Sequence, residues 1–124
     1  MTELRALTDH KVNGLNEALN IAVLDAPGAG GACHEYAIGW AAGHTTEIQT
    51  IKFQNGPIKE AGVNGISQEA LLAILIDRLK SFQAGEFSTK ENSVALTHLE
   101  TALLWLHKRT RDRIARGVEG TTAK

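Results

Sequence analysis

The spacing of apolar residues changes partway along this chain, and that change constrains the fold more than any other feature. In stretches within residues 19–54, apolar residues alternate with polar ones, which is typical of strands with one buried face. Across residues 67–117 they recur every three or four positions, which is typical of amphipathic helices. The sequence therefore predicts an α+β chain, in which a small antiparallel β meander precedes an antiparallel two-helix hairpin.

Three strands are expected in the N-terminal part. The first covers residues 19–23, and the glycine- and proline-rich run 25–31 interrupts it. The second covers residues 36–40 and the third residues 47–54, both with apolar residues at alternate positions. Residues 1–18 are polar and mixed, so we expect an arm or a loosely held lead-in there.

Two helices of unequal length are expected in the C-terminal part. Ser67 can cap the first helix and Gly85 ends it, after an apolar face that starts at Leu71 and finishes at Phe82. The second helix begins at a capping-box pattern in residues 88–91 and stops at Gly117. It spans about 40 Å, against about 27 Å for the first helix. The far end of the second helix must therefore project or meet another chain.

The length favours a single domain over residues 1–124, because two independent cores would each be marginally small. Within it we expect a β part (1–54), a structured loop (55–66), the helical hairpin (67–117) and a tail (118–124). The loop is indicated by three glycines and a proline between the two periodic regions.

Charge and cysteine content narrow the class of protein. The formal net charge is −1, which leaves no global field to hold an extended nucleic acid, so a basic site must be a local patch. The single cysteine, Cys33, excludes an internal disulfide framework. No run of about 18 apolar residues and no signal-peptide pattern is present, so we expect a cytoplasmic protein without a membrane partner.

No pattern in the sequence supports catalysis. Cys33 and His34 are adjacent on a predicted strand and point to opposite faces, so they cannot form a nucleophile-base dyad. His98 and His107 fall on opposite sides of one helix, so they cannot share a metal ion. The glycine-rich run 28–31 lacks the lysine and spacing of a phosphate loop. We therefore expect a protein that is not an enzyme and uses no cofactor or metal.

A basic cluster near the end of the second helix is a candidate ligand site. Residues 108–116 carry five basic side chains and one acidic side chain, a local charge of +4. Arg109 and Arg113 lie four residues apart on one helical face, where two guanidinium groups could hold a phosphate group. A solvated basic helix end, favoured by the helix dipole, explains the cluster equally well.

A second candidate site lies at the hairpin turn. The aromatic face of Phe82 suits stacking against a base, and the amide of Asn92 could hydrogen-bond to base or ribose edges. A terminal phenylalanine is more often part of the core, and that alternative stays open. Asn92 and Arg109 are about 25 Å apart on one helix, whereas a dinucleotide-sized ligand spans about 10 Å. If both contact one ligand, a second antiparallel copy must supply the missing end.

Four sequence blocks together resemble a known family. They are GPIKEAGVNG (56–65), LLAILIDRLKSFQAG (71–85), KENSVALTHLETALLWL (90–106) and RTRDRIARGVEGT (109–121). Over about residues 47–121 the chain resembles the phage Thoeris anti-defence sponge proteins of the first type, whose helical hairpin is shared with phage anti-CBASS cyclic nucleotide sponges.

The resemblance implies sequestration of a signal without its turnover. Members of that family bind cyclic ADP-ribose isomers, such as glyco-cyclic ADP-ribose, in the host cytoplasm, so the TIR-dependent effector stays inactive. The resemblance implies that Phe82 stacks on adenine, Asn92 contacts the nucleoside, and Arg109 and Arg113 meet the pyrophosphate. It further implies a homo-oligomer, either a dimer or a hexamer built as a trimer of dimers, with separate pockets for cyclic di- and trinucleotides.

Two other functions are compatible with the residues alone. A phage accessory protein could bind nucleic acid through residues 108–116, and its binding would weaken steeply with salt. A purely structural oligomerisation module would bind neither nucleic acid nor cyclic ligands.

Overall fold

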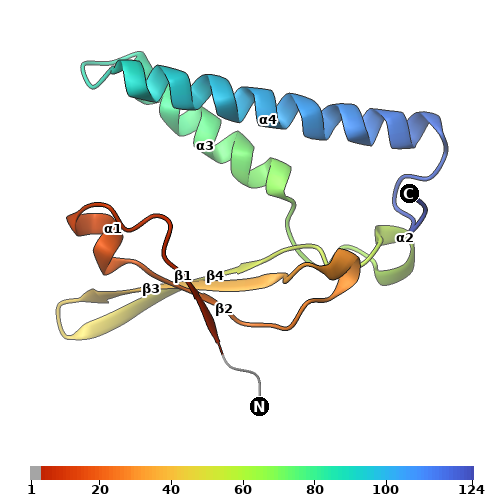
Figure 1. Ribbon diagram of the computed structural model, residues 1–124, viewed down its shortest axis with the longest axis horizontal. Helices are drawn as coiled ribbons and strands as arrows, with labels where there is room; N and C mark the ends of the chain where they lie inside the picture. Colours follow the sequence, from red (N-terminus) through yellow and green to blue (C-terminus); the bar gives the residue numbers. More distant parts are fainter. Residues whose placement is uncertain (1–3) are drawn as a thin grey trace. The chain divides into compact units, whose positions relative to one another are not determined.

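The computed structural model describes residues 4–124, which divide into two compact units (Figure 1). One unit ends at Ile66, and the other comprises Ser67–Lys124. The first unit contains all the strands of the described chain and the second contains its two longest helices. The predicted α+β class, with strands preceding a helical hairpin, is therefore confirmed. That residues 1–124 act as one domain stays a prediction.

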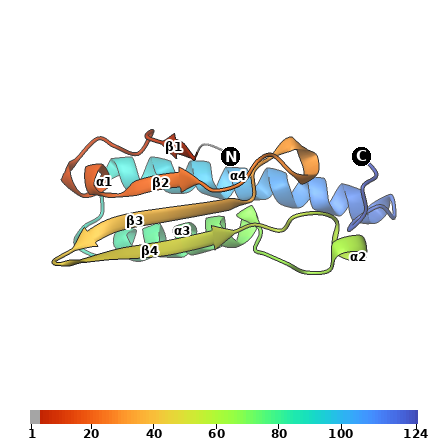
Figure 2. The same ribbon diagram turned by 90° about the horizontal axis from the view of Figure 1, so that it is seen from below.

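Four strands form one antiparallel sheet in the first unit, in the order β1-β2-β3-β4 (Figure 2). They are β1 (Arg5–Leu7), β2 (Asn20–Val23), β3 (Glu35–Ala42) and β4 (Thr45–Lys52). Each strand pairs with the next one along the chain, so the predicted meander is confirmed. Gly43 turns the chain between β3 and β4 with a φ of 64°, a conformation that glycine adopts without strain.

The segment before β2 is more regular than predicted. After β1, which pairs with β2, the chain forms the short helix α1 (Gly14–Ala18). The Asn13 side chain caps α1 by accepting a hydrogen bond from the backbone N–H of Asn16 at 3.1 Å. The prediction of a loosely held lead-in was therefore wrong for residues 4–18, because elements this short give no recognisable apolar period. For residues 1–3 that prediction lies outside the described part of the chain.

The glycine-rich connection between β2 and β3 is held by a buried histidine and a carboxylate. It contains the 3-10 turn η1 (Ala29–Gly31), and the Nε2 atom of His34 lies 3.0 Å from the carbonyl oxygen of Ala29. The Asp25 carboxylate accepts hydrogen bonds from the backbone N–H groups of His34, at 2.9 Å, and Glu35, at 3.1 Å. The His34 bond is the main reason that the pKa of Asp25 is lowered from its ordinary value.

The loop after β4 is structured, as predicted, and contains the one-turn helix α2 (Ile58–Ala61). The Gln54 amide organises this loop by donating to the carbonyl oxygens of Gly56, at 3.0 Å, and Gly62, at 2.7 Å. The oxygen of the same amide accepts a hydrogen bond from the backbone N–H of Asn64 at 2.8 Å. One side chain therefore satisfies three backbone groups that the loop cannot pair through regular structure.

The second unit is an antiparallel hairpin of α3 (Gln68–Gln83) and α4 (Lys90–Ala115). Ser67 caps α3 as predicted, by accepting a backbone hydrogen bond at 3.1 Å. Thr89 caps α4 at 3.0 Å, so the predicted capping box was displaced by one residue. Gly117, with a φ of 72°, ends α4 as predicted. Every helix within residues 4–124 is either too short or too polar to cross a membrane.

Much apolar surface stays exposed in the single chain. Among the described hydrophobic side chains, only Val23 in the sheet and Ile76 in α3 are buried. On the predicted apolar face of α3, Leu75 is 46% exposed, although its neighbours on that face are at least half-buried. Three large apolar side chains of α4 are each at least 60% exposed: Leu104, Trp105 and Ile114. Exposure of this extent on both helices is typical of a surface that contacts another molecule.

Candidate ligand-binding site

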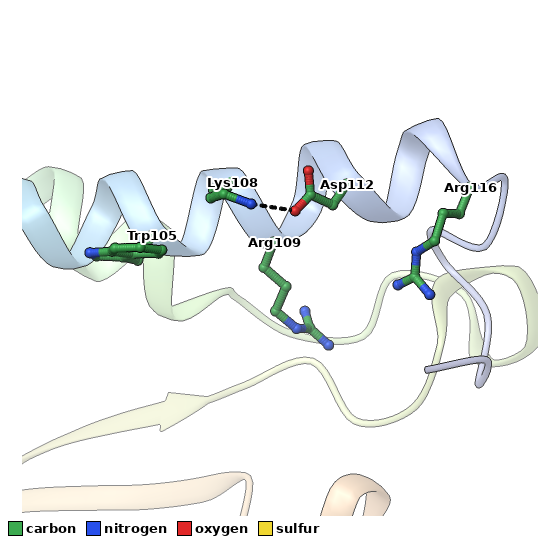
Figure 3. Close-up of a pocket in the computed structure, with 5 residues that line it drawn as sticks. All are labelled: Trp105, Lys108, Arg109, Asp112 and Arg116. Carbon is green, nitrogen blue, oxygen red and sulfur yellow. Dashed lines mark hydrogen bonds and ion pairs between the residues drawn. The ribbon is translucent and has the colours of Figure 1, made fainter.

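An open depression on α4 gathers one aromatic and four charged side chains (Figure 3). Its volume is about 270 Å³, and it is lined by Trp105, Lys108, Arg109, Asp112 and Arg116. Helical geometry explains this grouping, because residues four and seven positions apart lie on nearly the same face. The depression therefore follows from the spacing of these residues along one continuous helix.

The depression carries an excess of positive charge. Lys108 donates a hydrogen bond to Asp112 across one helical turn, with 2.7 Å between Nζ and Oδ2. Three cationic side chains thus face one carboxylate, which leaves two positive charges at the depression. Within residues 4–124 the Arg109 guanidinium makes no ion pair, so its planar donor fork is open to an anion.

Trp105 lines this depression, and its place there was not predicted from the sequence. Its side chain is 64% exposed, which is unusual for a tryptophan unless its ring contacts another molecule. In Figure 3 the Trp105 ring and the Arg109 guanidinium leave α4 on the same side. The four-residue spacing of the two side chains was a usable signal, but an aromatic residue within a helical apolar pattern is easily assigned to the core.

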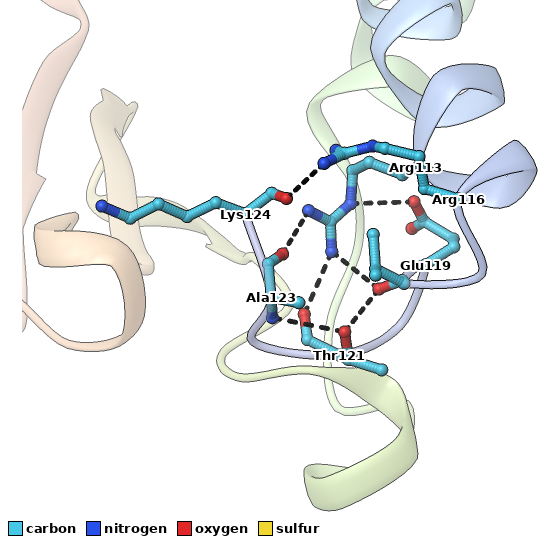
Figure 4. A network of polar contacts seen from close by, with 7 residues as sticks. Arg113, Arg116, Glu119, Thr121, Ala123 and Lys124 are labelled. Atoms are coloured by element: carbon cyan, nitrogen blue, oxygen red, sulfur yellow. Dashed lines mark hydrogen bonds and ion pairs between the residues drawn. The ribbon is translucent and has the colours of Figure 1, made fainter.

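Arg113 occupies a different environment from Arg109. Only 7% of it is exposed, and it donates four hydrogen bonds to the segment that follows α4 (Figure 4). The acceptors are the Glu119 carboxylate at 3.1 Å and the carbonyl oxygens of Val118 at 2.9 Å, Thr121 at 3.1 Å and Ala123 at 2.6 Å. The structure therefore does not place Arg113 in the depression beside Arg109, and Arg116 lies there instead.

Phe82 lies near the end of α3 and is half-buried. The guanidinium carbon of Arg78, one turn earlier, is 5.0 Å from the centre of the Phe82 ring, a cation–π contact. The Arg78 guanidinium thus lies over one face of the Phe82 ring. This contact was not predicted from the sequence, although its four-residue spacing is a recognisable helical pattern.

Asn92 lies in the first turn of α4, where its backbone N–H donates to the Thr89 side chain at 3.0 Å. Asn92 as a whole is half-buried. Because α4 is one helix from Lys90 to Ala115, Asn92 and Arg109 are about 25 Å apart along its axis. The structure thus keeps Asn92 away from the depression of its own chain. The roles of Phe82, Asn92, Arg109 and Arg113 as ligand contacts stay predictions.

Comparison with known proteins places these elements in a family. The model of the family described as Acb2/Tad1, hairpin domain, matches residues 46–111, which is more than half of the chain. The chain is also 51% identical over 78 residues to "Thoeris anti-defense 1" of Bacillus phage SBSphiJ7. That similarity covers 63% of this chain and 55% of the relative, so the chain spans about half the length of that curated protein. The match includes α3 and most of α4, and we conclude that this chain belongs to the Acb2/Tad1 hairpin domain family.

Proposed function

We propose that this protein is a phage anti-defence sponge that binds cyclic ADP-ribose isomers and holds them without cleaving them. The observation that carries the proposal is the depression on α4, where two positive charges remain uncompensated beside an exposed tryptophan. The pyrophosphate of a cyclic ADP-ribose isomer joins two ribose groups and carries about two negative charges at neutral pH, which matches this excess. The name of the phage relative of this chain, "Thoeris anti-defense 1", supports a role in evading the host's Thoeris immunity.

The pyrophosphate would bind at the depression, with Arg109 as its principal donor and Arg116 beside it. Guanidinium groups suit this role because their paired N–H groups match two phosphate oxygens. At the other end of the hairpin, Phe82, whose ring also contacts the Arg78 guanidinium, would stack on the adenine. Asn92 would hydrogen-bond to the nucleoside.

A shared pocket reconciles these roles with the length of α4. Asn92 and Arg109 of one chain cannot reach the same compact ligand, since they are about 25 Å apart. Two antiparallel copies of α4 would bring Asn92 of each chain to Arg109 of the other, which gives two symmetric pockets per dimer. The exposed apolar side chains of α4 supply a surface for this contact. Three such dimers would form the hexamer, with cyclic di- and trinucleotides bound in separate pockets.

Retention of the ligand without reaction is the chemically simplest outcome of this arrangement. The depression offers cations and one carboxylate that is already bonded to Lys108, but no nucleophile. Elsewhere, the Nε2 atom of His34 lies 3.0 Å from the carbonyl oxygen of Ala29, and within residues 4–124 no hydrogen bond joins the His34 ring to the Cys33 thiol. The protein would act in the host cytoplasm by lowering the free concentration of the signal.

A capture-and-release experiment tests the proposal. The purified protein is incubated with glyco-cyclic ADP-ribose, separated from unbound ligand, heated and analysed by chromatography. Recovery of unchanged ligand supports a sponge, recovery of cleavage products would show catalysis, and lack of depletion would refute the proposal. The same protein is titrated with duplex DNA at several salt concentrations. Steeply salt-dependent DNA binding without ligand depletion would favour the alternative nucleic-acid function.

Mixed oligomers test the shared pocket. Asn92→Ala and Arg109→Ala should each abolish capture in a homo-oligomer. When the two variants are unfolded, mixed and refolded together, some interfaces should pair an intact Asn92 with an intact Arg109. Capture should then return in part, and failure of the mixture to capture ligand would argue that each chain holds its own ligand.

A further inference from the structure

We propose that the outer edge of β4 pairs with the same edge of a second copy of this chain, which joins two four-stranded sheets into one continuous sheet. The paired stretch is 46–50, centred on Ile48. This contact lies in the first unit and differs from the proposed contact between α4 helices. It therefore goes beyond the proposed function and needs no ligand.

β4 is an edge strand that lacks the usual protection against pairing. It lies at one end of the strand order, and all eight of its residues pair with β3 in an unbroken register (Figure 2). Edge strands are commonly blocked by proline, by bulges or by lysines. β4 has no proline and no bulge, and its single lysine, Lys52, is its last residue. Such an edge is a template for another strand.

A hydrogen bond at the end of β4 shows which backbone groups point away from β3. The carbonyl oxygen of Lys52 accepts from the backbone N–H of Ile66 at 2.8 Å, so the outer side of β4 is already bonded there. Backbone groups of successive residues alternate between the two sides of a strand. Those of Thr46, Ile48 and Thr50 therefore face outward as well. Within residues 4–124 they make no hydrogen bond to another segment.

The free stretch of this edge is symmetric about Ile48, which fixes the register. It begins after the β3–β4 turn and ends before Lys52, which is bonded to Ile66. A two-fold axis at Ile48 places Ile48 opposite its own copy, and it places Thr46 opposite Thr50 of the second copy. The outward groups would then exchange about six backbone hydrogen bonds.

The side chains favour the same register. Ile48 is 64% exposed, and its neighbour on β3 is Gly39, which has no side chain to cover it. An axis at Ile48 buries this side chain against its own copy and sets no like charges opposite each other. An axis at Glu47 would oppose two carboxylates, and an axis at Gln49 would require pairing at Lys52, whose carbonyl oxygen is already bonded. A second copy is thus the partner that this edge fits.

A disulfide locates the axis. In a Cys33→Ser background, which removes the native thiol, Ile48→Cys would bring two thiols together across a hydrogen-bonded pair. The Cα atoms of such a pair are about 5.5 Å apart, a separation that a disulfide can bridge. The matched control is Gln49→Cys, the adjacent position, whose side chain points to the opposite face of the sheet. In a glutathione redox buffer without ligand, we expect about tenfold more covalent dimer from Ile48→Cys than from Gln49→Cys.

Two results of the disulfide experiment would overturn the pairing. Equal amounts of dimer from Ile48→Cys and Gln49→Cys would indicate chance collisions, and more dimer from Gln49→Cys would place the axis elsewhere.

The size of the assembly tests the contact without a cross-link. Ile48→Lys would oppose two ammonium groups at the axis, and it changes an exposed side chain, so its effect on folding is small. By sedimentation without ligand, we expect the mass to fall about twofold or more. Ile58→Lys makes the same change at another exposed isoleucine of the first unit and should leave the mass unchanged. An unchanged mass for Ile48→Lys, or an unsubstituted protein that stays monomeric, would contradict the pairing.

These measurements separate the pairing of β4 from the proposed function. If Ile48→Cys forms the disulfide but the unsubstituted protein does not capture glyco-cyclic ADP-ribose, only the proposed function is refuted. If the nucleotide is captured but the disulfide does not form, only the pairing of β4 is refuted.

Discussion

The Gln83 side chain exchanges two hydrogen bonds with the backbone of Thr89, and this exchange closes the turn between α3 and α4. Gln83 donates to the Thr89 carbonyl oxygen at 2.9 Å and accepts from its N–H at 3.0 Å. We expect Gln83→Ala to lower the free energy of unfolding by about 1 kcal/mol, since both bonds are partly exposed to water. Urea denaturation provides the measurement, with the exposed Gln68→Ala as control. An equal effect of both substitutions would show that the turn does not depend on this exchange.

Removing the carboxylate of the depression should strengthen anion binding. Asp112→Asn would release Lys108 from its ion pair and raise the local excess from two positive charges to three. We expect affinity for glyco-cyclic ADP-ribose to rise by about two- to fivefold at low salt, and less at high salt. Glu100→Gln makes the same change in net charge elsewhere on α4 and should have a smaller effect. Equal gains from both variants would locate the ligand away from the depression.

The aromatic face of Phe82 should contribute to affinity more than to stability. Phe82→Leu keeps an apolar side chain at the hairpin end but removes the stacking surface, so we expect binding to weaken by about 1–3 kcal/mol. Arg78→Met removes the cation above the ring but keeps a long side chain, and should have a smaller effect. Calorimetric titration measures the change in affinity, and thermal unfolding measures the change in stability. If Phe82→Leu lowers the thermal midpoint of unfolding but leaves the affinity unchanged, Phe82 is a core residue and does not contact the ligand.

The Asp25 carboxylate should make the first unit sensitive to acid. Its pKa is lowered from 3.8, chiefly because the His34 N–H donates to it. A lowered folded-state pKa contributes stability at all pH values above about 4, which is lost as the pH falls through the lowered pKa. We therefore expect Asp25→Asn to lower the thermal midpoint at pH 7, with a difference that shrinks below about pH 4. A constant difference across that range, or the same result from Asp9→Asn, would contradict this explanation.

Gly65 should tolerate no side chain. It lies beside the isolated parallel bridge between Phe53 and Ile66, and a Cβ atom at Gly65 would lie 2.5 Å from the carbonyl oxygen of Phe53. Backbone must move to relieve such a clash, so we expect Gly65→Ala to lower the thermal midpoint clearly. Gly14→Ala is the control, because no atom lies within 4 Å of its added Cβ. Similar midpoints for the two variants would mean that the loop rearranges freely.

The helical hairpin could be predicted almost completely from the sequence, because its apolar period extends over many turns and capping residues mark the helix ends. Ser67 and Gly117 mark two of its ends, and apolar residues recur over many turns between them. The short elements α1, α2 and β1 could not be predicted, since three to five residues are too few to show a period. Their formation depends on side-chain caps and on pairing with neighbouring segments.

The candidate site was only partly predictable. Charge density in the sequence indicated the end of α4, where Arg109 is exposed and lines the depression, and its role as a ligand contact stays a prediction. The spacing of Arg109 and Arg113 could not reveal that residues 118–124 fold back onto Arg113, because three of the four acceptors are backbone carbonyls. Every residue has a backbone carbonyl, so the sequence does not show which carbonyls accept a hydrogen bond from Arg113.

The exposed apolar side chains of α4 have a consequence for how such a protein would work over time. If two chains must meet to build each pocket, the number of pockets at low expression grows with the square of the protein concentration. Capture would then be negligible just after synthesis begins and would rise sharply once dimers accumulate. A phage using this protein would therefore gain more from producing it early and abundantly than from a modest improvement in its affinity.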